Sequence, residues 1–157
     1  MRKYLPHILI ISFVFILAPT AQVASYAGEV EDAKEEVRKN PDDADAHDNL
    51  GYTYYELGKY KEAIESCKQA IRIDPDFANA HNNLGLAYGE LGKHKKEIES
   101  YKQAIRLDPD FAWAHGNLGI AYSDLGRHEE AIDAYKQAIK IDPDDAHIMV
   151  SVLPMVS

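Results

Sequence analysis

PDFANAHNNLGLAYGELGKHKKEIESYKQAIRLD, at residues 75–108, is one copy of a pattern that recurs along this chain every 34 residues. The preceding segment, residues 41–74, is identical to it at 23 of 34 positions, and residues 109–142 follow the same pattern. A fixed period of this length is typical of proteins built by stacking one small structural unit. The period therefore predicts the architecture more strongly than any single residue does.

Each copy predicts a pair of helices joined by a short turn. In the quoted copy, apolar residues recur with helical spacing over 78–91 and again over 94–107. Gly92, between them, suits the left-handed conformation that closes a helix. Neither helix can bury its apolar face alone, so the pairs must stack on their neighbours to complete a core. The corresponding helices of the other copies are expected over 44–57, 60–73, 112–125 and 128–141.

The Asp-Pro-Asp triplet between copies should end each second helix, because proline disfavours helical geometry in the residue before it. The aspartate after the proline has a short side chain that can accept a hydrogen bond from the first turn of a following helix. We therefore expect N-caps at Asp76, Asp110 and Asp144.

Seven positions of each copy carry a recognisable motif. They are His47, Leu50, Gly51, Tyr54, Ala63, Cys67 and Pro75, then His81, Leu84, Gly85, Tyr88, Glu97, Tyr101 and Pro109, then His115, Leu118, Gly119, Tyr122, Ala131, Tyr135 and Pro143. This series resembles the pattern W-x2-L-G-x2-Y…A-x3-F…P of the tetratricopeptide repeat (TPR) family, over about residues 44–145. The resemblance implies an all-α fold, a right-handed α-solenoid in which stacked antiparallel helix pairs form a TPR superhelix.

The chain departs from the family pattern by using His in place of Trp, Cys67 in place of an aromatic residue, and Glu97 in place of a small alanine. Burying an unpaired charge is costly, so we expect Glu97 to reach solvent or to be neutralised. We expect Cys67, the single cysteine, to be a buried structural thiol; an exposed thiol for crosslinking or redox sensing is the alternative.

The N-terminus is a different kind of sequence. Arg2 and Lys3 precede the apolar run 8–18, and small residues before Gly28 suit cleavage after Ala27. This is the layout of a secretory signal peptide, and at about 1.5 Å per residue the run is short for a ~30 Å hydrocarbon core. An uncleaved anchor is the alternative.

The chain is thus expected to divide into four parts. They are a signal peptide (1–27), an N-terminal capping helix (28–40), three TPR units within 41–145 (about 44–77, 78–111 and 112–145), and a divergent apolar C-terminal tail (146–157). The tail lacks the motif of a fourth unit; it can cap the stack, associate with another copy, or reflect a truncated gene. We expect export to the periplasm or the exterior, with no stable membrane span in the mature form.

The resemblance to the TPR family implies that the binding surface lies on the first helices. In the TPR family the concave surface made by these helices is the usual ligand site, and the resemblance implies it here. At 100° per residue, the side chains that project away from the core of each first helix form the predicted partner-binding groove: Asp45, Asp48, Asn49, Tyr52, Glu56, Asn79, Asn82, Asn83, Leu86, Glu90, Trp113, Asn117, Ile120 and Asp124.

Two features of this set suggest its chemistry. Asn49, Asn83 and Asn117 recur with the period, and their amides can pair with the backbone of an extended peptide or bond neighbouring helices. The charged members are all acidic, which favours a neutral or basic peptide partner. The formal net charge of −9 disfavours nucleic acid.

Neither a metal nor a catalytic site is expected. The periodic histidines His47, His81 and His115 would lie roughly 8–10 Å apart on neighbouring helices, too far for one ion with bonds of about 2.0–2.1 Å. We expect them to fill the aromatic packing position. The sequence contains no Gly-rich phosphate loop, Cys-x-x-Cys motif or nucleophile elbow.

These observations favour a non-catalytic, exported protein–protein interaction module without cofactors, which binds a peptide or protein segment as a scaffold or assembly factor. One alternative is a structural protein that self-associates through its uncapped C-terminal end. Another is an accessory subunit of an envelope enzyme.

Overall fold

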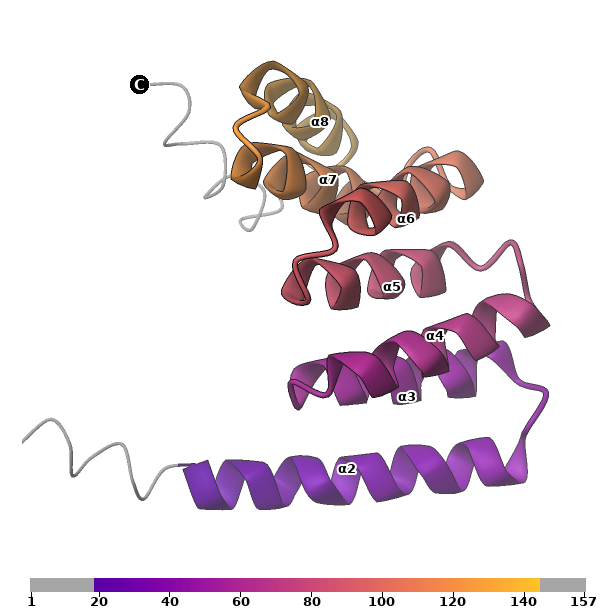
Figure 1. The fold of residues 1–157 in the computed structure, drawn as a ribbon. Coiled ribbons are helices and arrows are strands. Elements are labelled where there is room, and N and C mark those ends of the chain that lie inside the picture. The colour runs from indigo at the N-terminus through magenta and orange to yellow at the C-terminus, as the bar shows by residue number, and fades with distance from the viewer. Residues whose placement is uncertain (1–18, 145–157) are drawn as a thin grey trace, which may run out of the picture.

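The computed structural model describes the chain over residues 19–144, and its side chains from Gly28 onward. The tail 146–157 and the apolar run 8–18 lie outside the described residues. The helices are α2 (Pro19–Lys39), α3 (Ala44–Glu56), α4 (Tyr60–Ile73), α5 (Ala78–Glu90), α6 (His94–Leu107), α7 (Ala112–Asp124) and α8 (His128–Ile141). Figure 1 shows them stacked in chain order, from α2 at one end to α8 at the other.

The helices form antiparallel pairs, α3 with α4, α5 with α6, and α7 with α8, and α2 packs against α3. Among the first helices of the pairs, α3 contacts α5 and α5 contacts α7. The first helices therefore make a continuous inner layer, with the second helices behind it. This arrangement confirms the predicted all-α stack of helix pairs.

The second helices begin and end where the sequence predicts, and the first helices end one residue earlier than expected. The largest difference is at the N-terminus, where α2 begins at Pro19, well before Gly28. Residues 19–39 form one continuous helix, so the predicted junction between parts at 27 and 28 lies inside it. Val30, on this helix, is buried with 3% of its surface exposed.

The glycines between paired helices have the predicted left-handed conformation, with φ of 70° at Gly58, 65° at Gly92 and 71° at Gly126. After α3, the backbone N–H of Lys59 bonds the carbonyl of Tyr54, and that of Gly58 bonds the carbonyl of Tyr55. This is the Schellman arrangement, and equivalent bonds follow α5 and α7. The cation after each glycine then lies over the tyrosine ring of the preceding helix, as Lys59 does over Tyr54.

The predicted N-caps at Asp76 and Asp110 are wrong. The residues that cap α5 and α7 are Phe77 and Phe111, and neither makes a side-chain cap hydrogen bond. The aspartate before the proline makes the bond instead. Asp74 accepts a hydrogen bond from the backbone N–H of Asp76 at 3.0 Å. Asp108 and Asp142 accept the equivalent bonds from the backbone N–H groups of Asp110 and Asp144, both at 3.1 Å. These bonds fix the turn itself. Any helix after Asp144 lies outside the described residues.

Small residues on the first helices bring each pair into close contact. A Cβ atom on Gly85 would lie 2.6 Å from the ring of Tyr101, and one on Gly119 would lie equally close to Tyr135. In the first pair Gly51 faces Cys67, which is completely buried. The prediction of a buried structural thiol is therefore confirmed.

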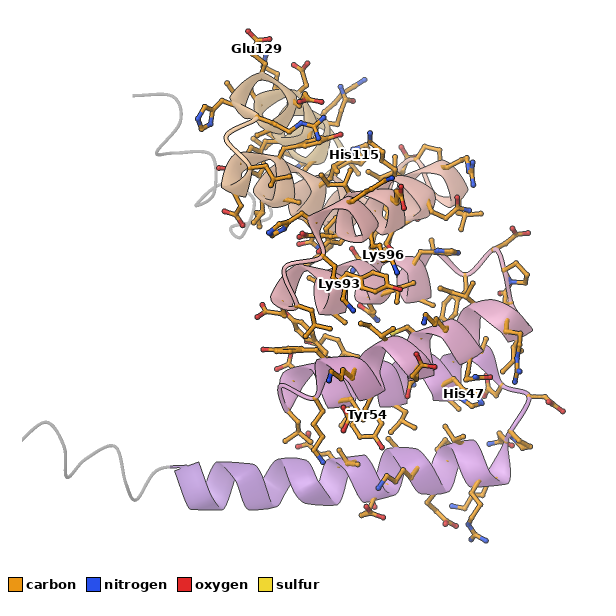
Figure 2. All side chains as sticks on the ribbon, viewed as in Figure 1. His47, Tyr54, Lys93, Lys96, His115 and Glu129 are labelled. Atoms are coloured by element: carbon orange, nitrogen blue, oxygen red, sulfur yellow. The ribbon has the colours of Figure 1, made fainter. Side chains whose placement is uncertain are left out.

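The periodic histidines do more than fill space. Nε2 of each donates to the carbonyl oxygen of the proline that opens its unit, six residues earlier. The bonds are His47 to Pro41 at 2.9 Å, His81 to Pro75 at 3.2 Å and His115 to Pro109 at 3.0 Å. Figure 2 labels His47 and His115 within the stack. Each histidine thus ties the start of its own first helix to the preceding turn.

Candidate functional site

All fourteen predicted groove residues lie on the inner layer formed by α3, α5 and α7. The structure divides them by exposure into three sets. The exposed ones are Asp45, Asn49, Tyr52, Glu56, Asn79, Glu90, Trp113 and Asp124; the half-buried ones are Asn83, Leu86 and Ile120; the buried ones are Asp48, Asn82 and Asn117. Tyr52 and Trp113 are the large apolar side chains most open on this layer, with 47% and 54% of their surfaces exposed.

The buried polar residues connect one unit to the next. Asn83 on α5 donates its amide to both carboxylate oxygens of Asp48 on α3, at 3.0 and 3.1 Å. One unit further on, Asn117 of α7 donates to the amide oxygen of Asn82 of α5, at 3.0 Å. The sequence allows two roles for the periodic asparagines, pairing with a peptide backbone and bonding neighbouring helices. These contacts show that Asn83 and Asn117 bond neighbouring helices. Asn49 is exposed.

Asp48 is a carboxylate in a poorly solvated position, with 6% of its surface exposed. Burial raises its pKa to about 6, and the nearby Asp45 adds to the shift, while the hydrogen bond from Asn83 opposes it. At the equivalent position the second unit has the neutral Asn82. The two inter-unit pairs therefore occupy equivalent positions but differ in charge.

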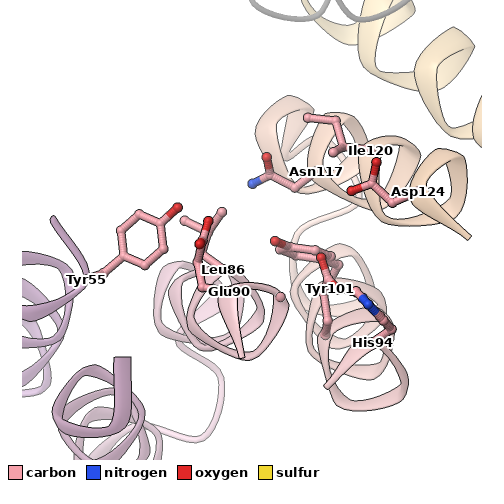
Figure 3. A pocket seen from close by; sticks show the side chains of 10 residues that line it. Tyr55, Leu86, Glu90, His94, Tyr101, Asn117, Ile120 and Asp124 are labelled. Atoms are coloured by element: carbon pink, nitrogen blue, oxygen red, sulfur yellow. Dashed lines mark hydrogen bonds and ion pairs between the residues drawn. The ribbon is translucent and has the colours of Figure 1, made fainter. Parts of the chain in front are cut away.

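A pocket of about 380 Å³ opens on the inner layer, and four helices line it. Its walls are Tyr55 of α3, Leu86, Gly89 and Glu90 of α5, His94, Glu97 and Tyr101 of α6, and Asn117, Ile120 and Asp124 of α7. Figure 3 shows these side chains converging from separate helices around one space. The pocket combines residues of three consecutive units, so it exists only in the stacked protein.

Glu97 and Gly89 form adjoining walls of the pocket at the second unit. Glu97 is buried, with 7% of its surface exposed, and Nδ1 of His94 donates to it at 2.9 Å. Burial raises the pKa of Glu97, and the hydrogen bond from His94 partly offsets this shift. Of the two outcomes expected for this carboxylate, exposure to solvent is therefore wrong, and the imidazole of His94 is its hydrogen-bond partner instead. Its carboxylate occupies space left by Gly89, since a Cβ there would meet Glu97 Oε1 at 2.6 Å.

The equivalent positions hold Tyr55 and Ala63 in the first unit, and Ser123 and Ala131 in the third. The first unit therefore has its large residue on the first helix, whereas both residues of the third unit are small. The second unit alone has its large residue, the acidic Glu97, on the second helix.

Acidic side chains dominate the charge of the pocket. Glu90, Glu97 and Asp124 line it, whereas neither Lys nor Arg does. Burial, and next to it the charge of Glu90, raises the pKa of Tyr55 to about 12.

Lysines lie on a different surface, where Lys61, Lys68, Lys93 and Lys96 line a depression beside Tyr88. Lys93 and Lys96, which are labelled in Figure 2, both lie over the Tyr88 ring.

Comparison with known proteins agrees with this geometry. Models described as TPR repeat match residues 51–92 and 90–126, and models described as tetratricopeptide repeat match residues 21–65 and 112–145. Together they span nearly all of the described helices. The chain belongs to the tetratricopeptide repeat family, with about three repeats, and this fold is typically non-catalytic. No curated protein sequence matches the chain.

Solved structures of this fold resemble the protein closely. A thermophilic TPR protein of Thermus thermophilus superposes with a TM-score of 0.78 at 26% identity, covering 87% of this chain and 75% of that one. MamA gives a TM-score of 0.70 at 28% identity, covering 85% and 81%. The first TPR domain of Spaghetti (RPAP3), bound to the HSP90 peptide SRMEEVD, gives 0.68 at 24% identity, covering 72% and 90%.

Sequence reasoning identified five of the ten pocket residues as groove residues, namely Leu86, Glu90, Asn117, Ile120 and Asp124. It did not place His94, Glu97 or Tyr101 in the site, because it assigned the groove to the first helices alone. The signal that could have found them is the unusual pairing of Gly89 with Glu97.

None of the helices between residues 19 and 144 is long and apolar enough to cross a membrane.

Proposed function

We propose that the inner layer of α3, α5 and α7 holds a segment of a partner protein, so that the chain acts as a scaffold or assembly factor. The observation that supports this function best is the pocket lined jointly by three consecutive units. A partner segment lying across the layer would contact every first helix at once. Exposed Tyr52 and Trp113 on the outer first helices supply apolar anchors on either side of the pocket.

The partner segment is neutral or basic. The exposed charged residues of the layer, such as Asp45, Glu56, Glu90 and Asp124, are all acidic. The RPAP3 domain of the same fold binds SRMEEVD, a peptide with more acidic than basic residues. A surface with the charges found here would repel such a ligand, which argues for a different peptide class.

A peptide panel tests this function. Fluorescence anisotropy at low salt compares basic, neutral and acidic peptides of one length on the full chain, with the basic set expected to bind most tightly. Replacing Tyr52→Ser and Trp113→Ser together should weaken binding about tenfold, as loss of aromatic anchors does at interfaces. The control replaces Asp133→Ser and Lys136→Ser, both exposed on α8. Tightest binding of the acidic set would reject the charge assignment, and equal binding by both variants would reject the surface.

We also propose that the protein is exported, on the basis of the basic start, apolar run and small residues of the first 27 residues. Fractionation of cells expressing the full chain, with mass spectrometry of its N-terminus, tests this. Recovery in the cytosolic fraction with Met1 or Arg2 as the first residue would contradict it.

A further inference from the structure

Tyr101 presents its hydroxyl group to the pocket. Only 2% of its surface is exposed, and its ring packs against Gly85, which fixes its orientation. Within residues 28–144, no residue makes a hydrogen bond with its hydroxyl, and no buried side-chain oxygen or nitrogen lacks a partner, so the hydroxyl is open to the pocket. Figure 3 shows this hydroxyl turned toward the space between Glu90 and Asn117. A ligand group in the pocket can therefore exchange hydrogen bonds with this hydroxyl in place of water.

The carboxylates around that hydroxyl have no cationic partner. Neither Glu90 nor Asp124 forms an ion pair with a Lys or Arg of residues 19–144, although such pairs occur on α2, on α4 and at the start of α8. His94 is the one basic side chain in the pocket lining, and Nδ1 of its ring is already committed to Glu97. The pocket therefore offers hydrogen-bond acceptors and negative charge from α5, α6 and α7 with no cation of its own.

We propose that this pocket is a subsite for the guanidinium group of an arginine side chain in the bound partner, an inference that rests on the proposed function. The guanidinium would lie among Glu90, Asp124 and the Tyr101 hydroxyl, with the ring of Tyr55 beside it. This assigns one residue type of the partner to one position along the groove, and so fixes the register of the segment.

Arginine fits these walls better than lysine for a geometric reason. The acceptors approach from separate helices, and a planar guanidinium presents five N–H donors in several directions, whereas an ammonium presents three from one point. The guanidinium plane also stacks on aromatic rings, and Tyr55 supplies one at the edge of the pocket. A volume of about 380 Å³ accommodates the side chain with water.

The experiment uses the full chain labelled with ¹⁵N-glycine, since Gly89 lines the pocket and reports on it directly. The probes are Nα-acetyl-arginine methylamide, its lysine analogue, and its citrulline analogue, which has nearly the shape of arginine without the charge. We expect a saturable shift of the Gly89 amide with the arginine probe, and at least about fivefold weaker binding of the other two. The Gly28 amide, on α2, should not shift.

Three variants and a matched control assign the effect to the pocket. Glu90→Gln, Asp124→Asn and Tyr101→Phe should each weaken the arginine probe about three- to fivefold. Glu99→Gln removes an exposed carboxylate of α6 that belongs neither to the groove nor to the pocket lining, and should leave binding within about twofold. Lack of a saturable Gly89 shift, equal binding of lysine or citrulline, or an equal effect of Glu99→Gln would overturn the subsite.

This outcome is separable from that of the proposed function. If peptides bind the groove but replacing their arginines by citrulline changes nothing, the subsite is wrong and the groove function stands. If the arginine probe binds as described but no peptide of the panel does, the subsite stands and the groove function fails.

Discussion

A Cβ atom on Gly89 would lie 2.6 Å from Oε1 of Glu97, so the glycine of α5 and the carboxylate of α6 share one space. The pair explains how an acidic residue is accommodated where the other units have alanine. Both members line the pocket, whereas Tyr55 and Ser123 stand at the positions equivalent to Gly89 in the other units. Removing either member should therefore change the effect of altering the other.

A double-mutant cycle measures this coupling. In the parent chain, Gly89→Ala pushes the Glu97 carboxylate away from His94, which offsets the gain of about 0.5–1 kcal/mol that alanine normally brings to a helix. In a Glu97→Ala background the space is empty and the full gain should appear. We expect a coupling free energy of about 0.5–2 kcal/mol by urea unfolding. Additive effects, within about 0.3 kcal/mol, would show that the two residues do not share the space.

The close approach of paired helices gives a second prediction. Gly85→Ala places a methyl group 2.6 Å from the Tyr101 ring, which is buried and cannot move aside as a flexible chain end can. We expect a loss of about 1–3 kcal/mol in the free energy of unfolding. Gly28→Ala is the matched control, since nothing lies within 4 Å of a Cβ there. A Gly85→Ala chain as stable as that control would contradict the packing.

The thiol of Cys67 should be unreactive in the folded protein. It is completely buried, and burial, with a contribution from the charge of Asp48, raises its pKa well above the usual range. Ellman's reagent should modify it only as fast as the protein unfolds. Lys68→Cys places a second thiol at the exposed neighbouring position. In that variant one thiol should react rapidly with the reagent and the other, Cys67, slowly. Rapid modification of the parent chain would mean that this helix pair opens readily.

The 34-residue period was sufficient to predict the helices, their pairing and the left-handed glycines, because these features depend on local sequence and on each unit repeating its neighbour. The roles of single polar residues were less accessible. Asp76 and Asp110 are suitable N-caps by type, yet the turn uses the aspartates at 74 and 108 instead. That choice depends on how the chain enters the next helix, which the residue types do not specify.

Contacts between units were the hardest to predict. Asp48, Asn82 and Asn117 look like groove residues on a single helix, but the neighbouring helix covers them. Their burial depends on the angle and spacing of α3, α5 and α7, and a helical projection contains neither. The same limit hid the pocket, since its walls come from both helices of the second unit and from its neighbours on each side.

Asp48 supplies a prediction about pH. Its pKa is about 6 in the folded protein against an ordinary value of 3.8, so between these two pH values the unfolded chain has lost a proton that the folded chain retains. The free energy of unfolding therefore falls as pH rises through this window, by up to about 3 kcal/mol from this group. Asp48→Asn removes the titration and gives the first inter-unit pair the composition of the Asn82–Asn117 pair. We expect the variant to be about 1–3 kcal/mol more stable than the parent at pH 7, and equal to it within about 0.5 kcal/mol at pH 3.

Thermal and urea unfolding at pH 3, 5 and 7 provide the measurement, with Asp110→Asn, at an exposed aspartate, as the control for general charge effects. The difference in the free energy of unfolding between this control and the parent should stay nearly the same at all three pH values, whereas that of Asp48→Asn should grow as the pH rises. If Asp48→Asn is instead less stable than the parent at pH 7, the ionised carboxylate is a net stabilising partner of Asn83. The hydrogen bonds of 3.0 and 3.1 Å would then outweigh the cost of burying the charge.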